Sequence, residues 1–143
     1  MNTTIEVVYQ PEQSTDNQRP LFLAPVSAGF PSPADDYIEN RLDLNKHLIQ
    51  HPAATFFVKV KGDSMIEAGI HSGDILIVDR ALEATDKKVV IAIIDGELTV
   101  KRIRIIEGKV FLLPENRDYS PTEITSAMSF EIWGVVTNVI HTL

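Results

Sequence analysis

A series of short apolar segments from Thr55 to the C-terminus restricts the fold of this chain more than any other feature of the sequence. Residues 55–61 alternate between apolar and polar side chains, and residues 75–78 form a continuous apolar run, as in half-buried and buried strands. Asp95-Gly96 lies between two apolar runs, a strong signal for a two-residue hairpin, and Glu107-Gly108 marks a second hairpin. This pattern predicts a mainly β fold, either a curled antiparallel sheet or a partly open barrel.

The N-terminal third of the sequence lacks this strand pattern. Residues 1–20 are mostly polar and have little apolar surface to bury, so we expect a mobile arm there. Residues 32–40 open with a Ser-Pro pair followed by two aspartates, which predicts the start of a helix. A second short helix is expected over residues 44–50, and it would end before Pro52.

The charge balance of the chain argues against direct DNA binding. The 143 residues, 44% of them hydrophobic, suit one ordinary domain with an arm attached. The formal net charge is −7, from 13 basic and 20 acidic residues. An acidic domain repels the phosphate backbone, and no helix-turn-helix pattern precedes the β-rich part.

The sequence also limits the cellular compartment of the protein and the kinds of catalysis open to it. It contains no cysteine, which excludes disulfides and thiolate catalysis. No apolar run approaches the ~18 residues that span a membrane, and the N-terminus lacks the features of a signal peptide. We therefore expect a soluble, cytoplasmic protein.

Ser64 and Lys101 are the best candidates for a catalytic pair. Ser64 lies where a strand-like run gives way to a short turn of helix, and Lys101 lies on the expected return strand after Asp95-Gly96. A serine hydroxyl becomes a good nucleophile when a base removes its proton, and a lysine kept neutral by burial can be that base. No histidine lies close in sequence to either residue.

Ser64 also has a structural interpretation. Ser64 and Glu67 match the Ser-x-x-Glu capping box, in which both side chains bond backbone N–H groups at a helix start. The two interpretations are compatible, because free N–H groups at a helix start can also stabilise an oxyanion. The spacing alone does not decide between them.

Lys101 can likewise be either a solvated residue on a half-exposed strand or a buried base. The period of two places Lys101 on one face with Ile103 and Ile105, while Arg102 and Arg104 lie on the other. Burial would disfavour the charged amine. Lowering the pKa from about 10.4 to about 7 would cost ~4–5 kcal/mol, so a buried lysine needs a functional reason.

Metal and carboxylate sites are less well supported. The four histidines lack metal-ligand spacing, and we expect them to be surface or cap residues; they are His47, His51, His71 and His141. Asp35 and Asp36 are interpreted as charges at a helix N-terminus. We therefore expect no metal and no cofactor.

Several separated motifs resemble one known family. They are Gly-Asp-Ser-Met at residues 62–65, Gly-Asp-Ile-Leu-Ile-Val-Asp at 73–79 and Thr-Val-Lys-Arg at 99–102. Their order and spacing resemble the LexA/UmuD family of self-cleaving serine peptidases. Residues 28–37, 41–45 and 48–52 are closer still to its UmuD-type members, and residues 130–136 fit the family too. The resemblance extends from about residue 21 to the C-terminus.

This resemblance implies a LexA/signal-peptidase-like β fold with Ser64 as the nucleophile and Lys101 as the general base. It implies that the bond between Ala28 and Gly29 is cut. The backbone N–H groups of Asp63 and Ser64 would stabilise the oxyanion. No cofactor is implied.

The implied cut divides the chain into a mobile arm, residues 1–28, and a peptidase and dimerisation domain, residues 29–143. In this family a RecA–single-stranded-DNA filament stimulates self-cleavage after DNA damage. The trimmed homodimer then joins a UmuC-type subunit, as the accessory part of an error-prone translesion DNA polymerase in the SOS response.

Two alternatives remain open at this point. The chain could be a β-rich dimerisation module that binds a polymerase without being cut, although Ser64, Lys101 and Ala28-Gly29 argue against this. It could also be a self-cleaving domain of the LexA or phage-repressor type. About twenty polar residues stand where such repressors carry a DNA-binding domain, which disfavours this second alternative.

Overall fold

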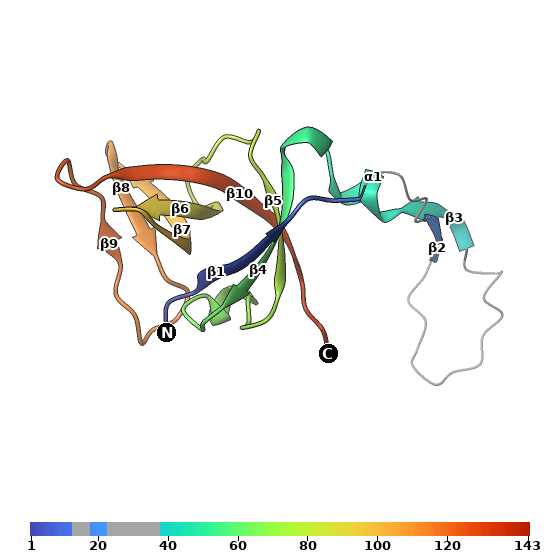
Figure 1. Cartoon of the computed structure of the whole chain (residues 1–143), viewed down its shortest axis with the longest axis horizontal. Coiled ribbons are helices and arrows are strands. Elements are labelled where there is room, and N and C mark those ends of the chain that lie inside the picture. The colour runs from blue at the N-terminus through green and yellow to red at the C-terminus, as the bar shows by residue number, and fades with distance from the viewer. Residues whose placement is uncertain (13–17, 23–37) are drawn as a thin grey trace. The chain divides into compact units, whose positions relative to one another are not determined.

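A computed structural model describes residues 1–12, 18–22 and 38–143 of the chain, with its elements labelled in Figure 1. The chain divides into two compact units, one formed by Met1–Pro11 with Ala53–Leu143 and the other by Glu12–Pro52. The larger unit contains an eight-stranded sheet, and the smaller unit contains a two-stranded sheet and a short helix.

The larger unit is an antiparallel sheet that closes on itself. In spatial order its strands are β1 (Thr4–Tyr9), β4 (Thr55–Lys61), β5 (Ile75–Asp79), β10 (Phe130–Ile140), β6 (Val89–Ile94), β7 (Glu97–Ile106), β8 (Lys109–Leu113) and β9 (Thr122–Glu123). Thr4 of β1 also pairs with Thr99 of β7, so the first six strands form a closed barrel. The prediction of a mainly β fold is confirmed, and the sheet expected to be curled or a partly open barrel is closed by this pairing.

Two tight hairpins follow the sequence prediction. Asp95 and Gly96 join β6 to β7 with φ angles of 49° and 85°. Glu107 and Gly108 join β7 to β8 with φ angles of 51° and 77°. Positive φ at both central residues matches the twist of antiparallel strands, which is why Asp-Gly and related pairs favour such turns. The first hairpin brings β7, which carries Lys101, back along β6.

Buried apolar side chains form two clusters. The first consists of Val58, Val60, Met65, Ile70, Leu76, Val78, Ile91 and Val100. The second consists of Val90, Ala92, Ile103, Leu112 and Val135. Each such side chain contributes roughly 1.5–3 kcal/mol on burial. Because Met65 and Ile70 belong to the first cluster, the core anchors the segment that directly follows Ser64.

Residues 4–9 form β1 and pair with β4, so the expectation of a mobile arm does not hold for them. The sequence of this strand, Thr-Ile-Glu-Val-Val-Tyr, is rich in residues that favour strands. Ile5 packs against the first core cluster. The polar composition of residues 1–20 as a whole obscured this short apolar segment.

In the smaller unit, β2 (Gln18–Phe22) pairs antiparallel with β3 (Ile38–Asp43). The helix α1 (Leu44–Leu48) follows β3 directly. Its N-cap Asp43 accepts hydrogen bonds from the backbone N–H groups of Asn45 and Lys46. The predicted helix over residues 44–50 is therefore present and ends two residues early, at Leu48.

The helix predicted over residues 32–40 can be compared with the structure only in part. Residues 32–37 lie outside the described part of the chain. Residues 38–40 belong to β3, so the helix prediction is wrong for them. Pairing with β2 satisfies their backbone groups in a way that a local helix signal does not reveal.

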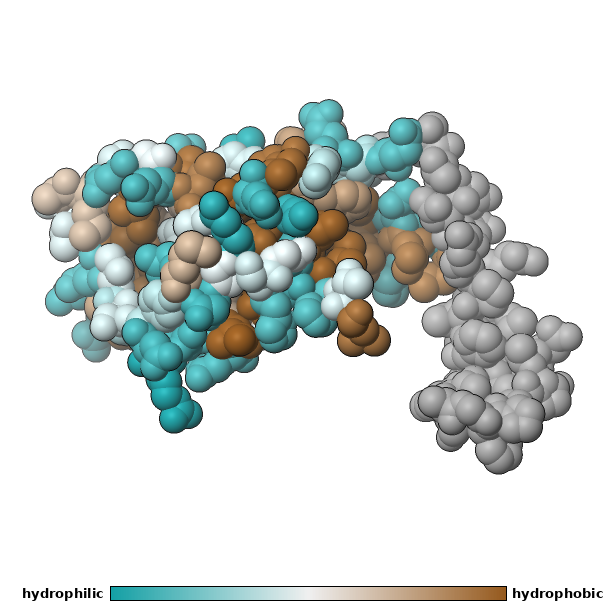
Figure 2. All heavy atoms as spheres, turned by 60° about the horizontal axis from the view of Figure 1, so that its bottom comes forward, coloured by the Kyte–Doolittle hydropathy of each residue, from teal (hydrophilic) through white to brown (hydrophobic). Residues whose placement is uncertain are grey.

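Polar and apolar residues are interspersed on the face of the molecule in Figure 2. Exposed apolar side chains include Val8 and Tyr9 of β1 and Ile140 of β10. Scattered exposed apolar residues are normal for folded domains. Among the described residues, no helix has the length and apolar character needed to cross a membrane.

Candidate active site

Ser64 lies in the connection that follows β4. The chain leaves β4 at Lys61, turns at Gly62, whose φ is +105°, and reaches the 3-10 helix η3 (Ile66–Ala68). The Ser64 side chain is completely buried, with an exposed fraction of 0%. A left-handed φ strains any residue with a Cβ, so glycine permits the turn that places Ser64 there.

The capping-box interpretation of Ser64 is wrong. The N-cap of η3 is Met65, and it makes no side-chain cap hydrogen bond. The Ser64 hydroxyl instead contacts Lys101 and the N-terminal segment of the chain. The helix is too short and begins one residue too late for the Ser-x-x-Glu geometry.

Lys101 reaches Ser64 from β7, which is separated from β4 in the sheet by β1. Its Nζ lies 3.1 Å from the Ser64 Oγ, within the range for direct proton transfer. The residue is 8% exposed, and burial lowers the pKa of its amine to about 8. No carboxylate of the described residues pairs with this amine; its other partners are the side-chain oxygens of Asn2 and Thr99. Uncompensated desolvation therefore makes the neutral amine accessible near physiological pH.

The strand pattern that favoured burial of Lys101 is only partly followed. Lys101 and Ile103 are buried, as the shared face predicts, while Ile105 is exposed near the end of β7. Val100 on the opposite face is completely buried as well, because β7 contributes to both core clusters. Both faces of the strand are therefore covered at the level of Lys101.

Residues 1–4 occupy the groove beside the Ser/Lys pair. The backbone N–H of Thr3 donates to the Ser64 Oγ at 2.8 Å, and the Ser64 hydroxyl donates to the Thr3 Oγ1 at 3.0 Å. The Thr3 carbonyl accepts from the backbone N–H of Val100 at 3.1 Å. The backbone N–H of Asp63 donates to the Met1 carbonyl at 3.0 Å. The groove thus binds an extended peptide through its main chain, as a peptidase binds a substrate.

An open cavity continues from this groove. It has a volume of about 610 Å³, and its lining includes Asn2, Thr99, Lys101 and Tyr119. A cavity beside the lysine leaves room for a peptide or a water molecule to approach the reacting atoms. The predicted cleavage residues Ala28 and Gly29 lie outside the described part of the chain.

Comparison with known proteins agrees with this geometry. Residues 20–137 match the family model described as Peptidase S24-like. The chain belongs to this family. SamA of Salmonella typhimurium is 50% identical over 132 residues, covering 92% of this chain and 89% of SamA. ImpA of Escherichia coli is 46% identical over 145 residues, covering 99% of this chain and 96% of ImpA. MucA of Escherichia coli is 44% identical over 120 residues, covering 83% and 82%.

These relatives are UmuD-like proteins, so the resemblance found in the sequence is confirmed. The Peptidase S24-like family comprises self-cleaving serine peptidases of the LexA/UmuD type, and this chain is one of them.

Sequence reasoning missed two features of this S24 chain. It did not foresee that residues 1–4 enter the groove, although the strand-favouring composition of β1 was a usable signal that this segment pairs with the sheet. It also did not foresee that two of the four histidines, expected to be surface or cap residues, lie close together. In the structure His71 and His141 lie beside Asp74, forming a group with metal-ligand chemistry. Local spacing gave no signal for this group, because His141 comes from a distant strand end.

Proposed function

We propose that this chain cleaves itself between Ala28 and Gly29, with Ser64 as the nucleophile and Lys101 as the general base. The observation that carries the proposal is the 3.1 Å separation of the Ser64 Oγ and the Lys101 Nζ inside a buried site. As a UmuD-like member of the S24 family, the chain has an accessory role to an error-prone polymerase in SOS mutagenesis.

The chemistry follows from the two side chains. Neutral Lys101 takes the hydroxyl proton while the Ser64 Oγ attacks the Ala28 carbonyl carbon. The bond to the Gly29 nitrogen breaks, and Lys101 returns the proton to the departing amine. Water then hydrolyses the ester between Ser64 and Ala28. The backbone N–H of Asp63, which already binds a carbonyl oxygen, is suited to hold the oxyanion together with that of Ser64.

Residues 1–4 must leave the groove before this reaction. Two extended peptides cannot both bond the Ser64 Oγ, and the Thr3 N–H lies 2.8 Å from it. The competing segment also satisfies the Asp63 N–H that the oxyanion needs. A well-aligned intramolecular reaction can reach effective molarities of about 10⁵ M, so an occupied groove would protect the precursor from premature cleavage.

Because residues 1–4 must leave the groove, an activator can act by favouring the state in which they have left it. We propose that a RecA–single-stranded-DNA filament stimulates cleavage by binding better to the state in which Ala28-Gly29 is docked. An effector shifts a conformational equilibrium only through such a difference in affinity. The products are residues 1–28 and 29–143, and a homodimer of the larger product would bind the UmuC-type polymerase subunit. A UmuC-type partner in general agrees with the UmuD-like relatives.

Incubation of the purified chain with RecA, an ATP analogue and single-stranded DNA tests the proposal. Intact mass spectrometry should detect residues 1–28 and 29–143 and no other pair of fragments. Ser64→Ala and Lys101→Ala should each abolish cleavage without loss of the folded β spectrum in circular dichroism. Lys109→Ala, which removes an exposed lysine of the same sheet, is the matched control and should cleave normally.

Three results would overturn the proposal. Cleavage at another bond would refute Ala28-Gly29 as the site. Normal cleavage by Lys101→Ala would refute the base. An intact native chain under all of these conditions would favour the non-cleaving polymerase-binding module instead.

A further inference from the structure

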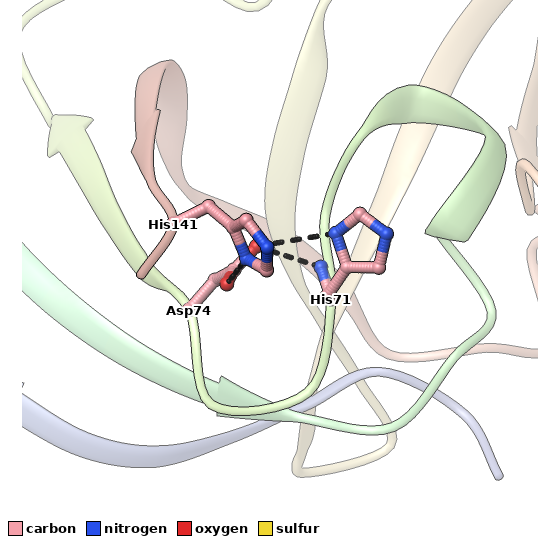
Figure 3. A group of neighbouring side chains, drawn as sticks. All are labelled: His71, Asp74 and His141. Atoms are coloured by element: carbon pink, nitrogen blue, oxygen red, sulfur yellow. Dashed lines mark hydrogen bonds and ion pairs between the residues drawn. The ribbon is translucent and has the colours of Figure 1, made fainter. Parts of the chain in front are cut away.

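The side chains of His71, Asp74 and His141 lie close together, as Figure 3 shows. Their potential ligand atoms all lie within 4.8 Å of one another. The His141 Nδ1 is 2.6 Å from the Asp74 Oδ1, and the His71 Nδ1 is 3.7 Å from the Asp74 Oδ2. None of the three residues takes part in the Ser/Lys site.

The sheet register and a tight turn bring the group together. Ile140 of β10 pairs with Ile75 of β5, so His141 and Asp74 continue this antiparallel pairing at the strand ends. The turn that holds His71 and Asp74 includes Gly73, with φ +92°. It is closed by the backbone N–H of His71, which donates to the Asp74 Oδ2 at 2.7 Å. Backbone structure therefore fixes all three positions.

Asp74 is a buried carboxylate that forms no ion pair with a lysine or arginine of the described residues. Its exposed fraction is 3%. Within the described part of the chain, its only ion-pair partners are the imidazoles of His71 and His141, which carry a charge only when protonated. Buried charges in proteins are paired or coordinate metals. A divalent cation would supply the missing positive charge.

His71 presents a ring nitrogen without a hydrogen-bond partner to the same place. Its Nδ1 is buried and has no hydrogen-bond partner, an exception among buried polar atoms that calls for an explanation. A neutral imidazole binds a metal through such a nitrogen. The His71 and His141 side chains remain 43% and 44% exposed, so an ion and a coordinating water have access to the group.

We propose that His71, Asp74 and His141 bind one Zn²⁺ ion. Two imidazole nitrogens and one carboxylate oxygen, with water in the fourth position, are a ligand set that Zn²⁺ accepts in tetrahedral geometry. Ligands at about 2.0–2.2 Å from the metal lie about 3.3 Å from one another, so the side chains need only small rotations. Binding displaces the hydrogen bond between His141 and Asp74 and releases any proton on the ligating nitrogens.

The ion would act as a structural clamp. It would join the C-terminal end of β10 to the turn before β5. That turn also follows the segment that begins at Ser64 and passes through η3. Because unfolding separates the three ligands, Zn²⁺ stabilises the folded chain.

Metal titration of the full chain tests the site. Ser64→Ala protein, treated with a chelator and then dialysed, is titrated with ZnCl₂ against a chromophoric chelator. We expect one Zn²⁺ per chain, at least about tenfold weaker binding in His71→Gln and His141→Gln, and unchanged binding in the control His47→Gln. Zn²⁺ should raise the Tm by about 5 °C in the parent and the control, and not in the two ligand variants.

Co²⁺ gives a second readout that does not depend on stability. A tetrahedral Co²⁺ complex should absorb in the visible range, and this absorption should be lost in His141→Gln. Circular dichroism establishes that each variant is folded before titration. Stoichiometric binding that survives both His71→Gln and His141→Gln would overturn the proposal. Failure of the parent protein to bind Zn²⁺ at micromolar concentrations would also overturn it.

Discussion

The backbone N–H of Thr3 donates a hydrogen bond to the Oγ of Ser64 at 2.8 Å, so the N-terminal segment lies directly against this hydroxyl. Thr3 is completely buried, and Thr4 continues the contact by pairing with Thr99 of β7. The first residues of the chain therefore complete the barrel and cover Ser64. In the proposed reaction, the Ala28-Gly29 segment would compete with these first residues for the groove.

Thr3→Lys should release this segment and expose Ser64. An unpaired ammonium costs several kcal/mol in a buried position, and here it would also face the amine of Lys101. Each 1.4 kcal/mol shifts the docking equilibrium tenfold, so we expect at least about tenfold faster labelling of Ser64 by a fluorophosphonate probe, measured by intact mass. Glu6→Lys introduces the same side chain at an exposed position of β1 and is the control.

Spontaneous cleavage should accelerate in parallel with labelling in Thr3→Lys. Equal labelling rates in Thr3→Lys, Glu6→Lys and the native chain would show that residues 1–4 do not protect the site. Faster labelling without cleavage under any condition would support protection of Ser64 by residues 1–4. It would count against self-cleavage.

The rate of spontaneous cleavage should depend on the protonation of Lys101. Burial lowers the pKa of this amine to about 8, and only its neutral form can accept the Ser64 proton. The rate should rise about tenfold per pH unit below pH 8 and level off above it. Cleavage rates from pH 6 to pH 10, followed by gel electrophoresis, measure this profile. A flat profile over that range would exclude Lys101 as the base.

Lys101→Met should stabilise the fold at neutral pH. Burial lowers the pKa of the lysine from 10.5 to about 8, and each pKa unit is worth about 1.4 kcal/mol. The full difference corresponds to about 3 kcal/mol, and partial solvent access reduces the expected gain to about 1–3 kcal/mol. Urea unfolding in the Ser64→Ala background measures it, with Lys109→Met as the exposed control.

This pH dependence of stability is opposite to that of a lysine whose pKa is raised on folding by a carboxylate partner. Between pH 8 and pH 10.5 the unfolded chain binds more protons at Lys101 than the folded chain, so stability of the parent rises with pH in that window. The advantage of Lys101→Met should therefore shrink as pH approaches 10.5. A constant or growing advantage would show that desolvation of the amine is not its cause.

Gly134→Ala should destabilise the barrel. Gly134 lies at a register shift in β10 where the strand pairs with β6, and an added Cβ would lie 2.6 Å from the Val78 Cγ1. Overpacking of this kind costs about 1–3 kcal/mol. Urea unfolding measures the loss in free energy of unfolding, and Ser129→Ala outside the strand is the control. Unchanged stability would mean that β5 and β10 can separate locally without cost.

Local sequence signals were sufficient for the fold class, the hairpins and α1. Asp95-Gly96 specifies its turn through the φ values that two adjacent residues adopt, and Asp43 caps α1 through its immediate neighbours. The alternation around Lys101 indicated burial without deciding it. These features depend on interactions over a few residues, which a sequence displays directly.

The sequence by itself determined that the chain would be a β-rich UmuD-like peptidase, and it singled out Ser64 and Lys101 as the candidate catalytic pair. Only the tertiary structure decided what surrounds them. Barrel closure placed Thr3 on Ser64, and the register of β5 with β10 placed His141 beside Asp74 and His71. Such contacts join residues far apart in the chain. They depend on which strands become neighbours when the whole sheet closes, and no local pattern encodes that choice.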